Sequence, residues 1–195
     1  MAASVRGILL AAGYSKRFGS NKLLQALPEG SPQAGTPIAL AAARHFLEAL
    51  PDSVAVVRPR AQKLAKILRD AGCNTVVCKN SGEGMGTSLA AGVRATSDAD
   101  GWIVALADMP FIRPETIRIV TKALQEGAAI AAPSFHGERG HPVGFARRFY
   151  EELSSLRGED GARQFLKPHP DWVTLFEVDD PGVLRDIDKP SDLER

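Results

Sequence analysis

The sequence predicts an α/β fold in which a mostly parallel sheet carries helices on both faces. Its length of 195 residues suits one domain. Short apolar runs alternate along it with longer stretches of helical periodicity, which is typical of parallel strands joined by crossover helices. Neither an internal repeat nor a linker interrupts this alternation. We therefore expect one domain with three layers, spanning residues 1–195.

Seven segments are predicted to be strands, because strands buried on both faces of a parallel sheet are short continuous apolar runs. They are residues 5–11, 54–57, 75–78, 102–107, 128–132, 143–145 and 173–178. Helical periodicity, with proline at the start or just beyond the end of some segments, predicts six helices. These are residues 38–50, 62–71, 85–96, 114–125, 147–156 and 161–166, while the Pro- and Gly-rich residues 28–37 are expected to form a loop.

Composition excludes several classes of protein. The 24 Lys and Arg residues nearly balance the 23 Asp and Glu residues, so no overall field favours nucleic acid or an anionic membrane as a partner. We find no apolar run long enough for a membrane span and no export signal. Cys73 and Cys78 cannot form a disulfide framework, and we expect buried thiols in a cytoplasmic protein.

The charges are unevenly distributed along the chain. Residues 1–28 contain no acidic residue, whereas residues 171–195 contain eight. Two solvated ends would explain this pattern. So would one site in which a basic loop holds an anion and the acidic segment holds a cation.

Ligands of open parallel sheets bind beyond the carboxyl ends of the strands. The positions to inspect therefore follow residues 11, 78, 107 and 132. The first of these loops contains Gly13, which permits a sharp turn, and Gly19, which allows the chain to reverse. Free N–H groups in such a loop bind anions, and Arg17 and Lys22 would pair with phosphate oxygens. The loop matches neither the Walker motif nor the dinucleotide fingerprint, and a solvated basic turn remains the alternative.

This loop resembles the signature of enzymes that transfer a nucleoside monophosphate from an NTP, carried here by Leu10, Ala11, Ala12, Gly13, Ser15, Arg17, Gly19 and Lys22. Further segments match in order at residues 82–89, 108–111, 140–143 and 186–190. Across nearly its whole length the chain is thus similar to the MobA-like group, in particular to MocA-type molybdenum cofactor cytidylyltransferases. The resemblance implies a Rossmann-like fold of the nucleotide-diphospho-sugar transferase type, with Mg²⁺ as cofactor.

The resemblance also implies roles for individual residues. Catalytic roles fall to Arg17, Lys22 and Asp108. The nucleotide would be bound by Leu10, Ala11, Ala12, Gly13, Arg17, Lys22, Gly82, Gly84 and Ser88. Gly84 and Gly86 would allow close approach of the nucleotide base and ribose. A glycine-rich helix start that packs against the sheet is the alternative. Glu83 departs from the aromatic residue that MocA-type proteins often carry nearby.

Asp108 and Asp188 are the candidate metal ligands. Asp108 follows a strongly apolar strand, where a carboxylate would hold a cation over the site, and Mg²⁺ needs only one or two carboxylates besides phosphate and water. A helix cap is the alternative role for Asp108. In an extended chain Asp186 and Asp188 should point in opposite directions. The resemblance favours Asp188 as the second ligand, with Asp186 capping or bridging through water, although all could be structural.

Arg139, Gly140 and His141 lie on the expected acceptor side. Pro142 holds the preceding residue extended, which would fix His141 at the rim of the cleft; a plain turn residue is the alternative. The implied reaction moves CMP from CTP to the phosphate of molybdopterin and releases pyrophosphate. A molybdoenzyme or its chaperone is a further candidate partner.

Three alternatives stay open. The methyl group of Ala12 would narrow the base pocket and favour cytosine, but a GTP-using guanylyltransferase has the same scaffold. A second alternative is a nucleotidyltransferase for a sugar phosphate or methylerythritol phosphate. The third is a non-catalytic nucleotide-binding factor that serves a molybdoenzyme.

Overall fold

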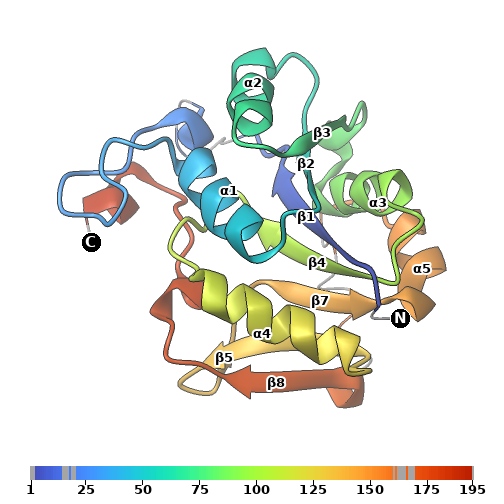
Figure 1. Cartoon of the computed structure of the whole chain (residues 1–195). Helices are drawn as coiled ribbons and strands as arrows, with labels where there is room; N and C mark the ends of the chain where they lie inside the picture. Colours follow the sequence, from blue (N-terminus) through green and yellow to red (C-terminus); the bar gives the residue numbers. More distant parts are fainter. Residues whose placement is uncertain are drawn as a thin grey trace.

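The computed structural model describes residues 3–14, 18, 21–159, 161, 166 and 170–194. Within these residues eight strands form one sheet (Figure 1). They are β1 (Val5–Ala11), β2 (Ser53–Val57), β3 (Asn74–Val77), β4 (Gly101–Leu106), β5 (Ile130–Phe135), β6 (Glu138–Arg139), β7 (Val143–Ala146) and β8 (Val173–Glu177). The seven predicted strands are therefore present, and the two-residue strand β6 is an addition.

The sheet is mostly parallel, as predicted. Its strand order is β3-β2-β1-β4-β7-β5-β6, and β8 pairs with β5. Strands β1 to β4 run parallel to one another, whereas β7 runs antiparallel to both β4 and β5. The prediction that β5 ends at Ala132 is wrong. Ser134 and Phe135 pair with β6, so the strand continues past Ala132 and that residue does not open a loop.

The described helices agree with the periodicity of the sequence. They are α1 (Ile38–Ala49), α2 (Gln62–Asp70), α3 (Met85–Ala95), α4 (Pro114–Gln125) and α5 (Tyr150–Ser155). Single 3₁₀ turns add η1 (Lys22–Leu24), η2 (Ser81–Glu83), η3 (Arg147–Phe149), η4 (Pro170–Trp172), η5 (Pro181–Leu184) and η6 (Pro190–Glu194). Most of the helix predicted at 161–166 lies outside the described residues. No described helix has the length and apolar character required to cross a membrane.

Alternation along β1 separates two hydrophobic cores. Leu9 and Ala11 face the core formed with α1, α2 and α4, whereas Ile8 and Ala12 face the core formed with α3 and α5. Helices therefore cover both faces of the sheet, as Figure 1 shows. Because both faces of the central strands are buried, their backbone is rigid, and the loops at their carboxyl ends are held on a fixed support.

Candidate active site

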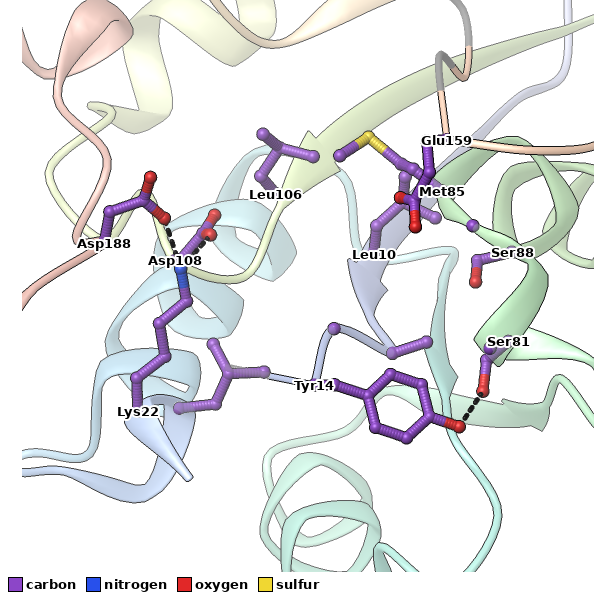
Figure 2. Close-up of a pocket in the computed structure, with 15 residues that line it drawn as sticks. Leu10, Tyr14, Lys22, Ser81, Met85, Ser88, Leu106, Asp108, Glu159 and Asp188 are labelled. Carbon is purple, nitrogen blue, oxygen red and sulfur yellow. Dashed lines mark hydrogen bonds and ion pairs between the residues drawn. The ribbon is translucent and has the colours of Figure 1, made fainter. Parts of the chain in front are cut away.

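A cavity of about 310 Å³ lies beyond the carboxyl ends of β1, β3 and β4 (Figure 2). The segment after β1, the 3₁₀ turns η1 and η2, the first turns of α3, the exit of β4 and the acidic C-terminal segment all contribute to its wall. Its lining residues are Leu10, Ala12, Gly13, Tyr14, Lys22, Leu23, Ser81, Gly82, Gly84, Met85, Ser88, Leu106, Asp108, Glu159 and Asp188. The loops after β1, β3 and β4 thus meet where the parallel sheet predicts a ligand.

A second cavity, of about 490 Å³, adjoins the first. Arg139, Gly140 and His141 lie on its wall. The residues that line both cavities are Leu10, Met85, Leu106, Asp108, Glu159 and Asp188. Two ligand-sized spaces therefore meet beside Asp108, which suits a reaction between two substrates.

Lys22 and two carboxylates form the charged centre of this junction. The Nζ atom of Lys22 lies 2.8 Å from Oδ2 of Asp108 and 2.9 Å from Oδ1 of Asp188 (Figure 2). Burial alone would lower the pKa of Lys22, but the charges and hydrogen bonds of Asp108 and Asp188 raise it above its usual value. Lys22 is therefore charged, and it brings together carboxylates that are 80 residues apart in the sequence.

The acidic C-terminal segment folds back onto β4, which brings Asp188 to the site. The side chain of Ile187 is fully buried in the core, and its backbone N–H donates a 3.0 Å hydrogen bond to the carbonyl oxygen of Asp108. Of the two interpretations of the charge asymmetry, the structure therefore supports a shared site rather than two solvated ends.

Asp180 fixes the beginning of the same segment. Its carboxylate is buried and accepts hydrogen bonds from the backbone N–H of Arg113 at 2.9 Å, the hydroxyl of Thr116 at 2.6 Å and the backbone N–H of Gly182 at 3.1 Å. Asp180 thus accepts hydrogen bonds from donors at the start of α4, although it lies far from that helix in the sequence. The side chain of Asp108 contacts Lys22 instead, so the alternative role of Asp108 as a helix cap is not supported.

The expectation that Asp186 and Asp188 point in opposite directions is wrong, since both line the second cavity. Residues 185–188 belong to no strand, and strict alternation requires regular β-structure. Burial raises the pKa of Asp186, and the negative charges of Asp188 and Asp108 raise it further. The junction therefore contains more negative charge than Lys22 alone can balance.

The glycines at the start of α3 accommodate another segment of the chain. A Cβ atom on Gly84, whose φ is +129°, would clash with the carbonyl group of Gly158. The backbone N–H of Gly86 donates a 2.9 Å hydrogen bond to that carbonyl oxygen. In the structure residues 157–159 of the chain itself approach Gly84 and Gly86, and they carry Glu159 to the cavities; close approach of the base and ribose at these glycines remains a prediction.

The residues predicted to bind the nucleotide do not all line the first cavity. Leu10, Ala12, Gly13, Gly82, Gly84 and Ser88 line the first cavity, whereas Ala11 is buried in the α1 and α4 core and lines neither cavity. Glu83 also lines neither cavity. Arg17, Ser15 and Gly19 lie outside the described residues.

The three residues on the expected acceptor side also pack against η5. A Cβ atom on Gly140 would lie 2.5 Å from the carbonyl oxygen of Val183, which accepts a 2.9 Å hydrogen bond from the backbone N–H of His141. His141, followed by a cis peptide bond to Pro142, is half-buried, and Arg139 is exposed on β6. Gly140 is thus required for packing, while Arg139 and His141 present side chains to the second cavity.

The sequence reasoning missed Tyr14, Glu159 and Asp180. The hydroxyl of Tyr14 lies 3.4 Å from Oγ of Ser81, and the guanidinium of Arg58 lies 4.9 Å from the centre of the Tyr14 ring. No local signal distinguishes Tyr14 or Glu159. Asp180 precedes Pro181 and Gly182, a pattern typical of a capped turn, and this signal could have identified it.

This fold and this site define a nucleotidyltransferase of the α/β class. Residues 7–173 match the profile of the MobA-like NTP transferase domain, and the chain belongs to that family.

Two curated relatives extend over almost the whole chain. Purine catabolism protein PucB of Bacillus subtilis is 28% identical, over 96% of this chain and 93% of the relative. Nicotine blue oxidoreductase of Paenarthrobacter nicotinovorans is 29% identical, over 98% of this chain and 95% of the relative. Their names describe different activities, so the likeness alone assigns neither to this chain.

Solved structures show the same architecture. Rv0371c of Mycobacterium tuberculosis superposes with a TM-score of 0.80 at 25% identity, over 100% of this chain and 97% of that chain. The same protein has also been solved in complex with manganese. Molybdopterin-guanine dinucleotide biosynthesis protein A of Archaeoglobus fulgidus, at 20% identity and a TM-score of 0.65, covers 97% of this chain and 95% of its own and shares the fold.

Proposed function

We propose that the protein transfers CMP from CTP to the phosphate of molybdopterin or the molybdenum cofactor, and releases pyrophosphate. The observation that carries this proposal is the position of Lys22, Asp108 and Asp188 where two cavities meet. The first cavity would take the nucleotide and the second the acceptor. The MocA-type resemblance of the loop after β1 supports CTP and molybdopterin as the particular substrates.

The carboxylates fit a divalent metal ion. Both converge on a single point, since one Nζ atom contacts an oxygen of each. In the described part of the chain no group of three or more His, Cys, Asp or Glu residues could enclose a metal ion. Two carboxylates completed by phosphate oxygens and water suit Mg²⁺, and Asp108 and Asp188 would hold it. When bound, the metal would neutralise charge on the α-phosphate and orient it.

The protein's own residues would supply position and charge. The acceptor phosphate is already anionic, so its oxygen needs no strong base to form a bond with the α-phosphorus of CTP. The bond from that phosphorus to the bridging oxygen then breaks, and pyrophosphate leaves with the electron pair. Lys22 would stabilise the charge that develops on the leaving group, and the two cavities would hold the reacting groups in line.

Ala12 lines the first cavity, and a methyl group at this position would reduce the space for a purine, which supports cytosine as the base. Arg139 and His141 line the second cavity and would bind the anionic part of the acceptor. Hydride transfer, which the name of one relative suggests, is not favoured by the loop after β1. That loop reads Leu-Ala-Ala-Gly and lacks the Gly-x-Gly of dinucleotide-binding enzymes.

Calorimetric titration of CTP, GTP and ATP with Mg²⁺ tests the nucleotide half of the proposal. We expect selective, metal-dependent binding of CTP that is lost in Asp108→Ala. A preference for GTP would instead indicate a guanylyltransferase. Binding of CTP without release of pyrophosphate, in the presence of the pterin acceptor, would indicate a non-catalytic maturation factor.

A further inference from the structure

Lys22 occupies the point at which the two candidate metal ligands converge. Its Nζ atom lies 2.8 Å from Asp108 and 2.9 Å from Asp188, and the residue is only 9% exposed. A divalent cation bridging these carboxylates would use the same oxygen atoms, at about 2.0–2.6 Å from each. The ammonium and the metal ion carry the same sign of charge, so they compete for one position.

We propose that Lys22 acts as a stand-in cation that holds the metal position in the nucleotide-free protein and leaves it when the metal–nucleotide complex binds. This inference rests on the proposed function, because it assigns the order in which the same site is filled. It predicts that the metal and the triphosphate enter together rather than one after the other.

The local structure allows Lys22 to exchange partners. A lysine ammonium is a point charge on a flexible stem, and it bonds carboxylate or phosphate without a fixed geometry. Lys22 opens the single turn η1, and the next residue, Leu23, is buried in the core. The backbone is therefore anchored while the side chain, which lines the first cavity, can turn from the carboxylates to a triphosphate.

The charges of the junction make each ligand depend on the other. In the described part of the chain, the carboxylates of Asp108 and Asp188 contact the same ammonium, and Asp186 lies close enough to be influenced by both carboxylates. A metal-free triphosphate would be repelled by these carboxylates. A metal ion without nucleotide would have to displace Lys22 from both of them. Binding of the two together removes both costs, and the resulting coupling must be reciprocal.

Mn²⁺ titration followed by electron paramagnetic resonance tests this exchange without any catalytic readout. The proteins are wild type, Lys22→Met and Lys189→Met, each with and without a CTP analogue that has a methylene group between the α and β phosphorus atoms. Lys189 is exposed and adjoins Asp188 in the sequence, so its variant controls for the loss of one nearby positive charge. Circular dichroism checks that each variant is folded, and Lys22→Gln replaces Lys22→Met if the latter is not.

Without nucleotide, we expect Lys22→Met to bind Mn²⁺ roughly tenfold more tightly than wild type, because the competing ammonium is gone, and Lys189→Met to resemble wild type. The analogue should tighten Mn²⁺ binding to wild type and have a smaller effect in Lys22→Met. Equal Mn²⁺ affinity of nucleotide-free wild type and Lys22→Met would overturn the inference. Failure of wild type to bind the analogue with Mn²⁺ would contradict the proposed function instead, and the nucleotide-free comparison would still report on Lys22.

Discussion

The backbone N–H of Ile187 donates a 3.0 Å hydrogen bond to the carbonyl oxygen of Asp108, which ties the acidic C-terminal segment to the exit of β4. The Ile187 side chain is fully buried in the core, and this packing also holds the segment in place. The carboxylates of Asp108 and Asp188 are therefore positioned by backbone pairing and core packing as well as by Lys22. Contacts that hold this segment should thus affect both stability and the site.

Asp180 is the strongest of these contacts, and Asp180→Ala should lower the free energy of unfolding by about 3 kcal/mol. The substitution leaves the donors of Arg113, Thr116 and Gly182 without the buried carboxylate that they share. Urea denaturation measures the change, and Asp179→Ala, at an exposed neighbouring position, is the control. Equal losses in both variants would show that the contact is not the cause.

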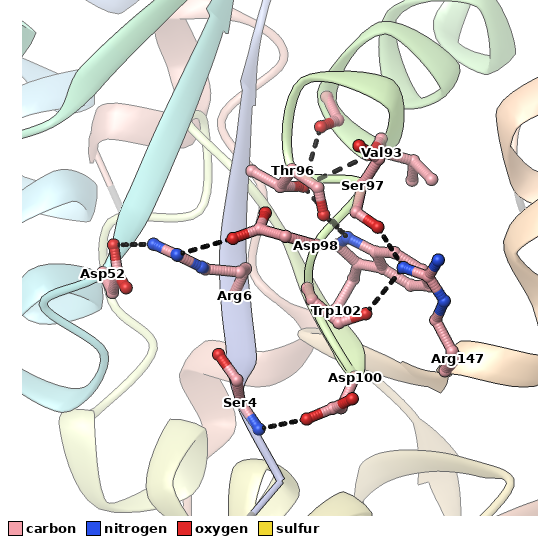
Figure 3. Close-up of polar contacts among 12 residues, drawn as sticks. Ser4, Arg6, Asp52, Val93, Thr96, Ser97, Asp98, Asp100, Trp102 and Arg147 are labelled. Carbon is pink, nitrogen blue, oxygen red and sulfur yellow. Dashed lines mark hydrogen bonds and ion pairs between the residues drawn. The ribbon is translucent and has the colours of Figure 1, made fainter.

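Ion pairs at the amino ends of the central strands provide a second comparison. Figure 3 shows Arg6 of β1 between Asp52 and Asp98, and Asp98 lies 3.1 Å from the guanidinium. Both carboxylates are mostly exposed, so solvent screens the pairs and each contributes about 1 kcal/mol or less. Arg6→Met should therefore cost much less stability than Asp180→Ala and leave nucleotide affinity unchanged.

Gly84→Ala should displace residues 157–159 from the start of α3. The new methyl group would meet the carbonyl of Gly158, and φ at this position is unfavourable for any residue except glycine. We expect a loss of about 1–3 kcal/mol in stability, and faster hydrogen exchange at the amide of Gly86. Gly82→Ala is the matched control, because among the described residues its methyl group would meet only Tyr14, whose hydroxyl would lie at 3.5 Å. Unchanged exchange in Gly84→Ala would refute the packing argument.

Cys73 gives a prediction for pH dependence. Burial raises the pKa of this thiol to about 11, whereas an unfolded cysteine has a pKa of about 8.5. Between these two pH values the Cys73 thiol therefore stays protonated in the folded state but loses its proton in the unfolded state. The stabilisation is complete below about pH 8.5 and is lost as pH rises to about 11, by roughly 3 kcal/mol. Chemical denaturation across this range should show a shallower decline in Cys73→Ala, and identical declines would contradict the assignment.

Ala12→Gly should shift nucleotide preference toward GTP. Removing the methyl group would enlarge the first cavity, which Ala12 lines, and space of this kind changes discrimination by about 1–3 kcal/mol, or roughly 10–200-fold. The ratio of the dissociation constants for CTP and GTP, measured by calorimetry, reports the change. Ala11→Gly is the control, because Ala11 faces the core and lines neither cavity. A ratio unaffected by Ala12→Gly would remove Ala12 from base selection.

Periodicity predicted the elements of the fold because central strands buried on both faces and amphipathic helices leave strong local patterns. It also located the loops after β1, β3 and β4, since parallel strands place their carboxyl ends at one edge. The direction of β7 and the pairing of the extended β5 with β8 depend on segments that are far apart in the sequence. Local pattern carries no information on such pairing.

The site was predicted in part. The motif resemblance selected Lys22, Asp108 and Asp188, and the structure brings these three side chains together. The same resemblance could not reveal that Gly84 and Gly86 accommodate Gly158, because the contact joins segments far apart in the sequence. Asp186 was misplaced for a related reason. A rule for regular strands was applied to a segment that the structure leaves irregular.

The central claim is tested most directly by incubating the protein with CTP labelled at the α-phosphate, molybdopterin and Mg²⁺, and measuring the label that enters the pterin product. We predict one labelled CMP in the product for each pyrophosphate released, with turnover reduced by several powers of ten in Asp108→Ala. Transfer that is unchanged in this variant would contradict the proposed site. No transfer by folded wild-type protein that binds CTP would contradict the proposed reaction.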